Sequence, residues 1–246
     1  MCGIVGYVGK RNAQDVLLDG LEKLEYRGYD SAGVALALEG GIRVVKSKGR
    51  LAELRKRLAV EALARSGCGI GHTRWATHGE PSDVNSHPHS TPRVSIVHNG
   101  IIENYLELRE RLTKEGVSFC SDTDTEVVSN LIARLYEEQG DLLEAVRMAV
   151  ARLEGSYALG IVCRDEPGQI IAAKKDSPLI FGFGEGENFI ASDVPAILKY
   201  TRQVAYLDEG DMAVFTASGV TFYNALGEQV EKKPEKITWE LSDAER

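Results

Sequence analysis

Apolar residues in the first third of the chain follow the periods of strands and helices in turn. Residues 2–9 form an apolar run typical of a buried strand, and residues 12–25 place apolar side chains on one face of a helix. Gly40-Gly41 separates two further apolar runs and marks a hairpin. The pattern predicts a charged amphipathic helix at 51–65 and strands at 32–38, 42–46, 68–75 and 93–102.

The middle of the chain is helical, and the last third consists mostly of strands. Apolar residues recur every three or four positions over 103–115, 124–138 and 142–153, which predicts three consecutive helices. After Gly155, short apolar runs separated by turn residues predict one short helix at 194–200 and strands at 156–163, 169–174, 179–183, 188–192, 203–207, 211–216 and 220–224.

This order of elements favours one fold class. Strands that alternate with helices indicate a doubly wound parallel sheet, whereas strands on either side of a block of helices indicate stacked antiparallel sheets covered by helices. We therefore predict an α+β fold. Residues 228–246 are charged and lack apolar periodicity, which predicts a domain over residues 2–227 followed by a charged linker.

Composition and charge exclude several classes of protein. The 246 residues are enough for one large domain with a sizeable core. No apolar run reaches the roughly 18 residues of a membrane span, and the N-terminus lacks the pattern of a secretory signal. The formal net charge of −8 opposes nucleic-acid binding, and four cysteines in a chain of this size suggest reduced thiols. We expect a cytoplasmic protein with no nucleic-acid or membrane partner.

Cys2 is the first candidate for chemistry. Removal of Met1 would leave a thiol and a free α-amino group on the same residue. The amine has a pKa of about 7.7–8.0 and the thiol about 8.5, so the amine can take the thiol proton at a cost of about 1 kcal/mol. An adjacent base of this kind activates a nucleophile. If Met1 is retained, the amine becomes an amide that cannot act as a base.

All the histidines lie within one short stretch of the chain, close to Cys68. They are His72, His78, His87, His89 and His98. A zinc site is the alternative interpretation, but neither a Cys-x-x-Cys nor a His-Glu-x-x-His spacing is present. Histidines in a polar, turn-rich segment more often line a pocket or bond to the local backbone. We therefore expect no metal and no cofactor.

Residues 72–81 combine groups suited to binding a small polar molecule. The planar guanidinium of Arg74 fits a carboxylate in a bidentate manner. Trp75 beside it provides a rigid wall, and Thr77 and His78 can donate or accept hydrogen bonds. The alternative is a surface arginine on an edge strand.

His98-Asn99-Gly100 ends the apolar run that begins at Val94. Asn-Gly often marks a hairpin turn, which is the structural alternative. The functional interpretation is an oxyanion hole, in which the Asn99 amide and the Gly100 backbone N–H converge on one oxygen. One such donor contributes about 10²–10³ in rate.

The segment 121–126 precedes a predicted helix. Thr123 and Glu126 have the spacing of a capping box, which accounts for both residues structurally. Asp124 then lies in the first helical turn, where a carboxylate is favoured. A carboxylate there could hold a substrate ammonium, and with Arg74 it could recognise an amino acid.

These motifs resemble a known family. Cys2-Gly3-Ile4-Val5-Gly6 is similar to the start of the class II glutamine amidotransferases, which are N-terminal-nucleophile hydrolases. The stretches 24–33, 72–81, 85–89 and 98–104 resemble one branch, the glutaminase domains of glutamine–fructose-6-phosphate aminotransferases. The similarity extends from Cys2 to about Tyr223.

The resemblance implies a fold and a reaction. The fold would be a four-layer αββα sandwich with Cys2 at the end of a central strand. Cys2 would attack the side-chain amide of glutamine, and Asn99 and Gly100 would form the oxyanion hole. Arg74 would hold the glutamine carboxylate and Asp124 its ammonium group. In addition, Trp75, Thr77 and His78 would belong to a closing loop, and Arg27 would support the nucleophile.

The resemblance also implies a larger protein. Members of this branch continue into a sugar-phosphate isomerase domain, which receives the ammonia and makes glucosamine 6-phosphate, and the full-length enzyme is expected to be a homodimer. Two alternatives stay open on the residues alone. One is a cysteine hydrolase of another amide, and the other is a silent module that binds an amino acid.

Overall fold

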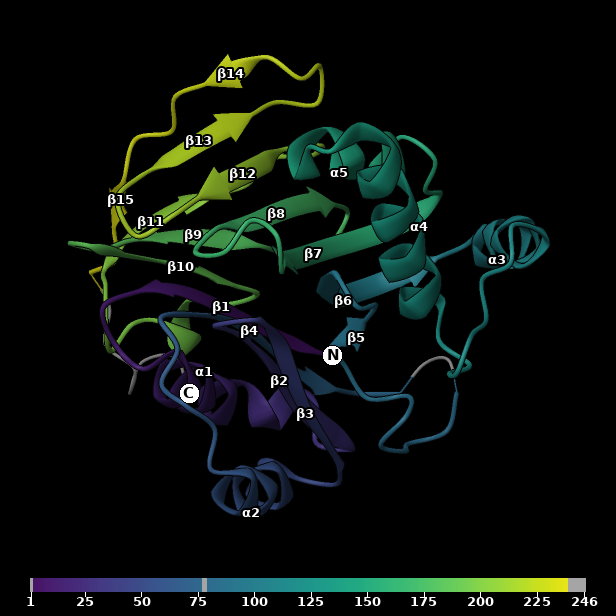
Figure 1. Ribbon diagram of the computed structural model, residues 1–246. Helices are drawn as coiled ribbons and strands as arrows, with labels where there is room; N and C mark the ends of the chain where they lie inside the picture. Colours follow the sequence, from purple (N-terminus) through teal and green to yellow (C-terminus); the bar gives the residue numbers. More distant parts are fainter. Residues whose placement is uncertain (1, 77–78, 239–246) are drawn as a thin grey trace.

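Two antiparallel sheets packed face to face form the centre of the molecule (Figure 1). A computed structural model describes residues 2–76 and 79–238. The first sheet has the strand order β15-β11-β9-β10-β1-β4-β2-β3. The second has the order β14-β13-β12-β8-β7-β6-β5.

The strand bounds follow the hydrophobic runs closely. The first sheet consists of β1 (Gly3–Gly9), β2 (Ser31–Leu38), β3 (Gly41–Lys48), β4 (Cys68–Arg74), β9 (Ile180–Phe183), β10 (Glu187–Ala191), β11 (Gln203–Tyr206) and β15 (Glu235–Lys236). The second consists of β5 (His89–Ser90), β6 (Val94–Ile102), β7 (Gly155–Cys163), β8 (Ile170–Lys175), β12 (Met212–Phe215), β13 (Val220–Tyr223) and β14 (Gln229–Val230).

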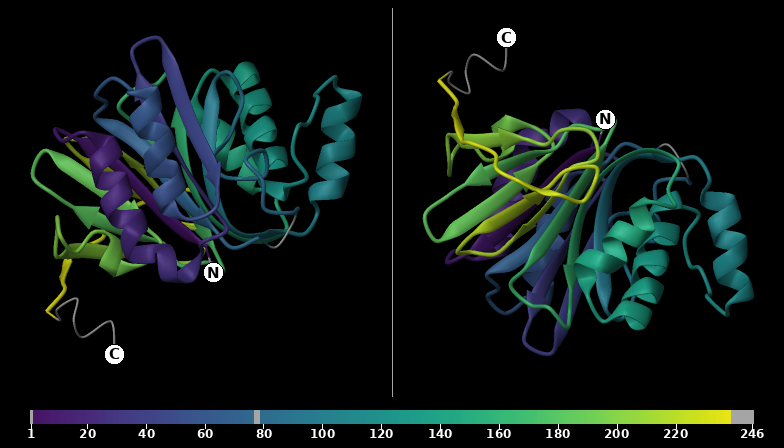
Figure 2. Two further views of the ribbon diagram at one scale, coloured as in Figure 1. Left: turned by 90° about the horizontal axis from the view of Figure 1, so that it is seen from below. Right: turned by 90° about the horizontal axis from the view of Figure 1, so that it is seen from above.

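Helices cover the outer face of each sheet (Figure 2). On the first sheet lie α1 (Ala13–Leu24) and α2 (Leu51–Glu61), and on the second lie α4 (Asp124–Gln139) and α5 (Leu142–Val150). The helix α3 (Tyr105–Lys114) packs beside α4, and the short 3-10 helices η1 (Glu25–Arg27) and η2 (Val194–Ala196) lie near α1. The predicted αββα arrangement of four layers is confirmed.

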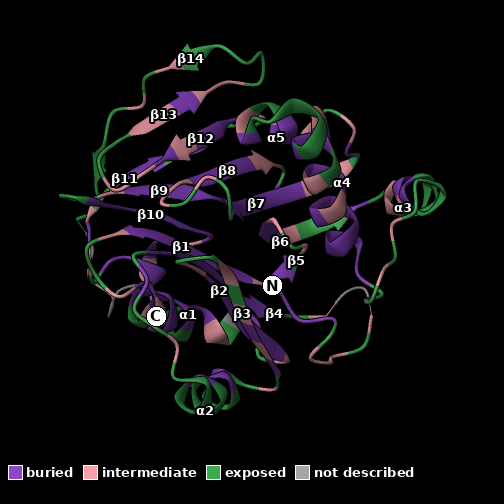
Figure 3. Ribbon diagram, viewed as in Figure 1, coloured by how far each residue is buried: buried purple, intermediate pink, exposed green. Residues whose placement is uncertain are grey.

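The period-2 alternation of each central strand divides the interior into three cores. In β1, Ile4 and Val8 face the second sheet, whereas Val5 and Tyr7 face the helices. Strand β7 divides in the same way, because alternate residues of a strand point to opposite faces of its sheet. Both faces of the central strands are therefore buried, as Figure 3 shows.

The structure differs from the sequence prediction at elements with little hydrophobic signal. The predicted helix at 51–65 ends at Glu61, because Ala62 is left-handed with φ 45°. Only a 3-10 turn lies within 194–200, and β5 was not predicted. Where a linker was expected, β14 and β15 pair with the sheets and Ile237 is buried. These two-residue strands are held by backbone bonds, which leave no periodic pattern.

Phe181 is central to the core between the sheets. Its ring is fully buried and packs edge-on against Phe183, Phe215 and Phe222, with centroids 4.8 to 5.3 Å away. We expect Phe181→Ala to lower the free energy of unfolding by about 3–5 kcal/mol, because it leaves a cavity in a close-packed interior. Urea unfolding measures this loss, with Leu226→Ala on the surface as the control. A loss below about 1 kcal/mol would show that the core can collapse around the cavity.

Candidate active site

Cys2 directly precedes β1, which lies between β10 and β4 in the middle of the first sheet. Its Sγ accepts a hydrogen bond from the Trp75 backbone N–H at 3.2 Å. Burial raises the pKa of the Cys2 thiol, while the Trp75 N–H and the charge of Arg74 act in the opposite direction. The thiol therefore needs a base and local donors to react as a thiolate.

Asn99 and Gly100 approach Cys2 from the second sheet. Asn99 Nδ2 donates to the Cys2 carbonyl oxygen at 3.0 Å. Gly100 has φ +120°, and a Cβ there would lie 2.2 Å from the Ser156 carbonyl oxygen, so the strand requires glycine at this position. Both residues lie inside β6, paired with β7, so the alternative of a hairpin turn is wrong.

One cavity of about 410 Å³ opens between these groups. It is lined by Cys2, Trp75, Asn99, Gly100, Ile101, Ser156, Asp176, Ser177, Pro178 and Ser192. The sequence analysis did not identify Ser156, Ser177, Ser192 or Asp176. They come from the start of β7, the loop before β9 and the turn after β10, and no local motif marks them.

Arg74 ends β4 and is buried rather than exposed. One guanidinium nitrogen, Nη2, donates to the Gly79 carbonyl oxygen at 3.2 Å. Burial lowers the pKa of Arg74, while Asp30, Cys2 and Asp124 raise it. Because β4 lies between β1 and β2, the alternative of a surface arginine on an edge strand is wrong.

Asp124 is the first residue of α4 and is also buried. Its Oδ2 accepts the Ile102 backbone N–H at 2.8 Å, which ties the start of α4 to the end of β6. The Thr123 hydroxyl caps the helix by accepting the Glu126 N–H at 3.3 Å. The reciprocal half of the predicted capping box differs, because the Glu126 carboxylate accepts the backbone N–H groups of Cys120 and Ser121 instead.

Arg74 and Asp124 lie near the cavity without lining it. The structure brings Cys2, Trp75, Asn99 and Gly100 together around one space, and both charged residues are buried. Trp75 is 48% exposed at the mouth and meets Tyr29 edge-on at 5.5 Å. The side chain of Arg27 is not described, and Thr77 and His78 lie outside the described residues.

Asp30 is a further residue that the sequence analysis missed. Its carboxylate accepts the Ala76 backbone N–H, and its own N–H donates to the Arg74 carbonyl oxygen at 3.1 Å. Asp30 therefore holds the backbone on both sides of Trp75, the residue whose N–H reaches the Cys2 sulfur.

Four of the histidines form a buried cluster that contacts Asn99 through His72. His72 stacks on His87 with ring centroids 4.1 Å apart, and His87 meets His89 edge-on at 4.9 Å. His98 bonds Thr125 at 2.9 Å through Nδ1 and the Ser156 carbonyl oxygen at 3.3 Å through Nε2. Within residues 2–76 and 79–238, no group of three or more His, Cys, Asp or Glu side chains is placed to hold a metal ion.

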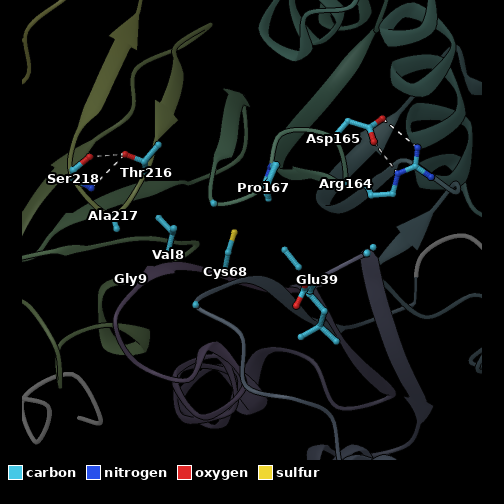
Figure 4. Close-up of a pocket in the computed structure, with 16 residues that line it drawn as sticks. Val8, Gly9, Glu39, Cys68, Arg164, Asp165, Pro167, Thr216, Ala217 and Ser218 are labelled. Carbon is cyan, nitrogen blue, oxygen red and sulfur yellow. Dashed lines mark hydrogen bonds and ion pairs between the residues drawn. The ribbon is translucent and has the colours of Figure 1, made fainter.

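A larger cavity of about 800 Å³ lies at the other end of β1, about 20 Å from Cys2 by the length of the strand (Figure 4). Turns line most of it, and burial raises the pKa of its thiol, Cys68, to about 12. Arg164 and Asp165 form an ion pair with each other at 2.8 Å. This cavity places no nucleophile beside a base, so the Cys2 cavity is the candidate active site.

The buried histidines should make the fold sensitive to acid. Burial lowers the pKa of His72 to about 3 and also lowers those of His87, His89 and His98. An unfolded histidine titrates near pH 6.5. The unfolded chain thus binds more protons below that pH, so stability is complete above about pH 6.5 and falls below it, by up to about 1.4 kcal/mol per pH unit for each histidine.

Urea unfolding between about pH 8 and pH 5 measures this dependence, and the interval from about pH 8 to 7 serves as the control because histidine is mostly neutral there in both states. The same free energy of unfolding at pH 7 and pH 5 would contradict the neutral histidine cluster.

Comparisons with known proteins identify the family of this chain. The glutamine amidotransferase domain family matches residues 55–235. A glutamine–fructose-6-phosphate aminotransferase from Clostridium acetobutylicum is 55% identical to this chain, and the match covers all of this chain and 40% of that protein. The one from Aquifex aeolicus is 53% identical, and the match covers all of this chain and 41% of that protein. The chain therefore spans about two fifths of the length of these curated relatives.

Solved structures show the same fold. The glutamine phosphoribosylpyrophosphate amidotransferase from B. subtilis superposes with a TM-score of 0.79 at 24% identity, covering 91% of this chain and 49% of that one. A class II glutamine aminotransferase domain protein from Silicibacter pomeroyi superposes with a TM-score of 0.62 at 17% identity, covering 91% of this chain and 99% of that one. No helix among the described residues is long and apolar enough to cross a membrane. The family match covers most of the chain, including Arg74, Asn99, Gly100 and Asp124 but not Cys2, and this chain belongs to the glutamine amidotransferase domain family.

Proposed function

We propose that this chain hydrolyses L-glutamine to L-glutamate and ammonia, with the Cys2 thiol as the nucleophile. The observation that carries the proposal is the meeting of Cys2 from the first sheet with Asn99 and Gly100 from the second around one cavity. Family membership supports glutamine as the substrate.

Removal of Met1 supplies the base. The freed α-amino group of Cys2 takes the thiol proton, and the Trp75 N–H at 3.2 Å stabilises the resulting thiolate. This donor offsets part of the burial that raises the pKa of the thiol.

The thiolate then attacks the side-chain carbonyl carbon of glutamine. The carbonyl oxygen becomes an oxyanion, which accepts hydrogen bonds from Asn99 Nδ2 and the Gly100 N–H. The C–N bond breaks as the ammonium of Cys2 returns a proton to the nitrogen, and ammonia leaves from a γ-glutamyl thioester. Water attacks the thioester, with the amine again as base, and releases glutamate and the thiol.

The α-carboxylate and the α-ammonium group of glutamine each require a binding group of the opposite charge. Arg74 binds the α-carboxylate and Asp124 the α-ammonium, and both are buried, where charge pairing is less screened than in water. On this proposal Trp75, Thr77 and His78 form the loop that closes over glutamine, and Arg27 supports the nucleophile.

The fate of the ammonia concerns a larger protein. We propose that residues 228–246 lead toward a sugar-phosphate isomerase domain, and that the ammonia is transferred there to fructose 6-phosphate to make glucosamine 6-phosphate. The relatives named glutamine–fructose-6-phosphate aminotransferase, of which this chain matches about 40%, support this assignment. The proposal includes a cytoplasmic homodimer.

A diazo-ketone analogue of glutamine tests the nucleophile. We expect intact mass to show a species without Met1 that gains one adduct, mapped to Cys2, and we expect Cys2→Ala to lose both the adduct and glutaminase activity. Cys120→Ala is the matched control, because Cys120 is an exposed free thiol. An adduct on Cys120 alone, or turnover by Cys2→Ala, would overturn the assignment. Loss of Met1 without an adduct would favour a binding module.

Arg74→Ala tests substrate recognition. We expect it to raise the KM for glutamine by about 100-fold or more, because a charge-assisted bidentate contact is worth about 3 kcal/mol. Arg74→Lys should recover only part of this loss, since lysine keeps the charge without the planar fork. Arg93→Ala is the control, as Arg93 lies far from Cys2 and faces Asp165 at 3.8 Å. An unchanged KM in Arg74→Ala would remove Arg74 from the site.

A further inference from the structure

The oxyanion hole depends on which way the Asn99 amide faces. An asparagine side chain carries an acceptor oxygen and a donor nitrogen of nearly the same shape. With Nδ2 toward Cys2, the amide donates to the Cys2 carbonyl oxygen at 3.0 Å and keeps a second N–H for a substrate oxyanion. In the flipped orientation, an oxygen would face the Cys2 carbonyl oxygen, and the donor would be lost.

His72 lies on the other side of the same amide. Its Nε2 is 3.0 Å from Asn99 Oδ1 and 3.0 Å from the His98 carbonyl oxygen. Because a carbonyl oxygen can only accept, Nε2 must carry the proton, and it donates to both oxygens. A flipped Asn99 would bring its NH₂ group against this N–H. The His72 donor therefore penalises the orientation that would disable the oxyanion hole.

The surroundings of the His72 ring favour one of its two neutral tautomers. The side chain is fully buried on β4, and its plane lies 13° from that of His87. Its Nδ1 is buried without a hydrogen-bond partner among the described residues. A proton moved from Nε2 to Nδ1 would lose two hydrogen bonds and gain none, so the neutral ring keeps the tautomer that Asn99 requires.

We propose that His72 is a positioning residue for the oxyanion hole, which holds the Asn99 amide with its nitrogen toward the nucleophile. The inference rests on the proposed glutaminase activity and adds a residue that acts through Asn99 without contacting glutamine. It connects three strands, because β4 carries His72, β6 carries Asn99 and β1 begins beside Cys2.

Two substitutions separate the hydrogen bond from the packing. His72→Phe keeps an aromatic ring against His87 and removes the donor. His72→Gln keeps a donor, since the glutamine amide nitrogen can reach the place of Nε2. We expect His72→Phe to lower kcat by about 10- to 100-fold, a loss approaching that of one oxyanion donor, with little change in KM. His72→Gln should recover most of kcat.

His87→Phe is the matched control. His87 is also buried in the same stack, and its Nε2 lies 3.4 Å from Thr125 Oγ1, with no bond to Asn99. Thr125 keeps its contact with His98 in this variant. We expect the thermal stability of His87→Phe to fall as much as that of His72→Phe, with kcat close to that of the wild type. Should His72→Phe fail to fold, His72→Asn replaces it, because its shorter amide does not reach Asn99.

A double-mutant cycle with Asn99→Ala distinguishes positioning from general packing. If His72 acts through Asn99, His72→Phe should change kcat by less than about twofold once Asn99 is alanine, because coupled residues are not additive. The same factor of loss in both backgrounds, or a wild-type kcat in His72→Phe, would overturn the inference. Absence of wild-type turnover and of a Cys2 adduct would instead overturn the proposed function.

Discussion

The hydrogen bond from Asn99 Nδ2 to the Cys2 carbonyl oxygen joins the two sheets at the candidate active site. The proposed nucleophile and the proposed oxyanion donors belong to different sheets, so neither sheet alone forms the candidate site. Their approach depends on close packing between the inner faces. Gly160 in β7 shows how tight that packing is, because a Cβ there would lie 3.1 Å from a side-chain carbon of Ile190 in the first sheet. Glycine at this position lets a side chain of the first sheet lie against the backbone of the second.

The same interface explains the buried polar cluster. The Asn99 amide, the proposed oxyanion donor, lies between two sheets and must be oriented from within the protein, where an unpartnered polar group is costly. Neutral histidines lie around this amide: His72 and His98 each donate to a backbone carbonyl oxygen, and His98 Nδ1 also bonds to the Thr125 hydroxyl group. Burial keeps their pKa values low, so the hydrogen-bond pattern near Asn99 does not change across the neutral pH range. The same buried histidines lower the stability of the folded protein in acid.

The carboxylates near the site accept hydrogen bonds from backbone N–H groups. Asp30 accepts the Ala76 N–H, Asp124 accepts the Ile102 N–H, and Glu126 accepts two N–H groups before α4. Asp30 thus holds the backbone beside Trp75, Asp124 holds the end of β6, and Glu126 holds the segment before α4. The acidic residues are therefore part of the scaffold as well as candidates for binding, which is why the capping motif at Thr123 is compatible with a role for Asp124 in recognition.

The sequence by itself determined the hydrophobic elements, the antiparallel α+β class and the residues with distinctive chemistry, Cys2, Arg74, Asn99 and Asp124. Hydrophobic periodicity predicts the elements and the fold class, because alternate positions of a strand face different cores. Similarity to known motifs identifies the four residues. Only the tertiary structure decided which side chains share the cavity. Ser156, Asp176 and Ser192 reach Cys2 from segments more than 150 residues away along the chain, and β14 and β15 pair through backbone groups. Such contacts arise from the packing of distant strands, which no local pattern encodes.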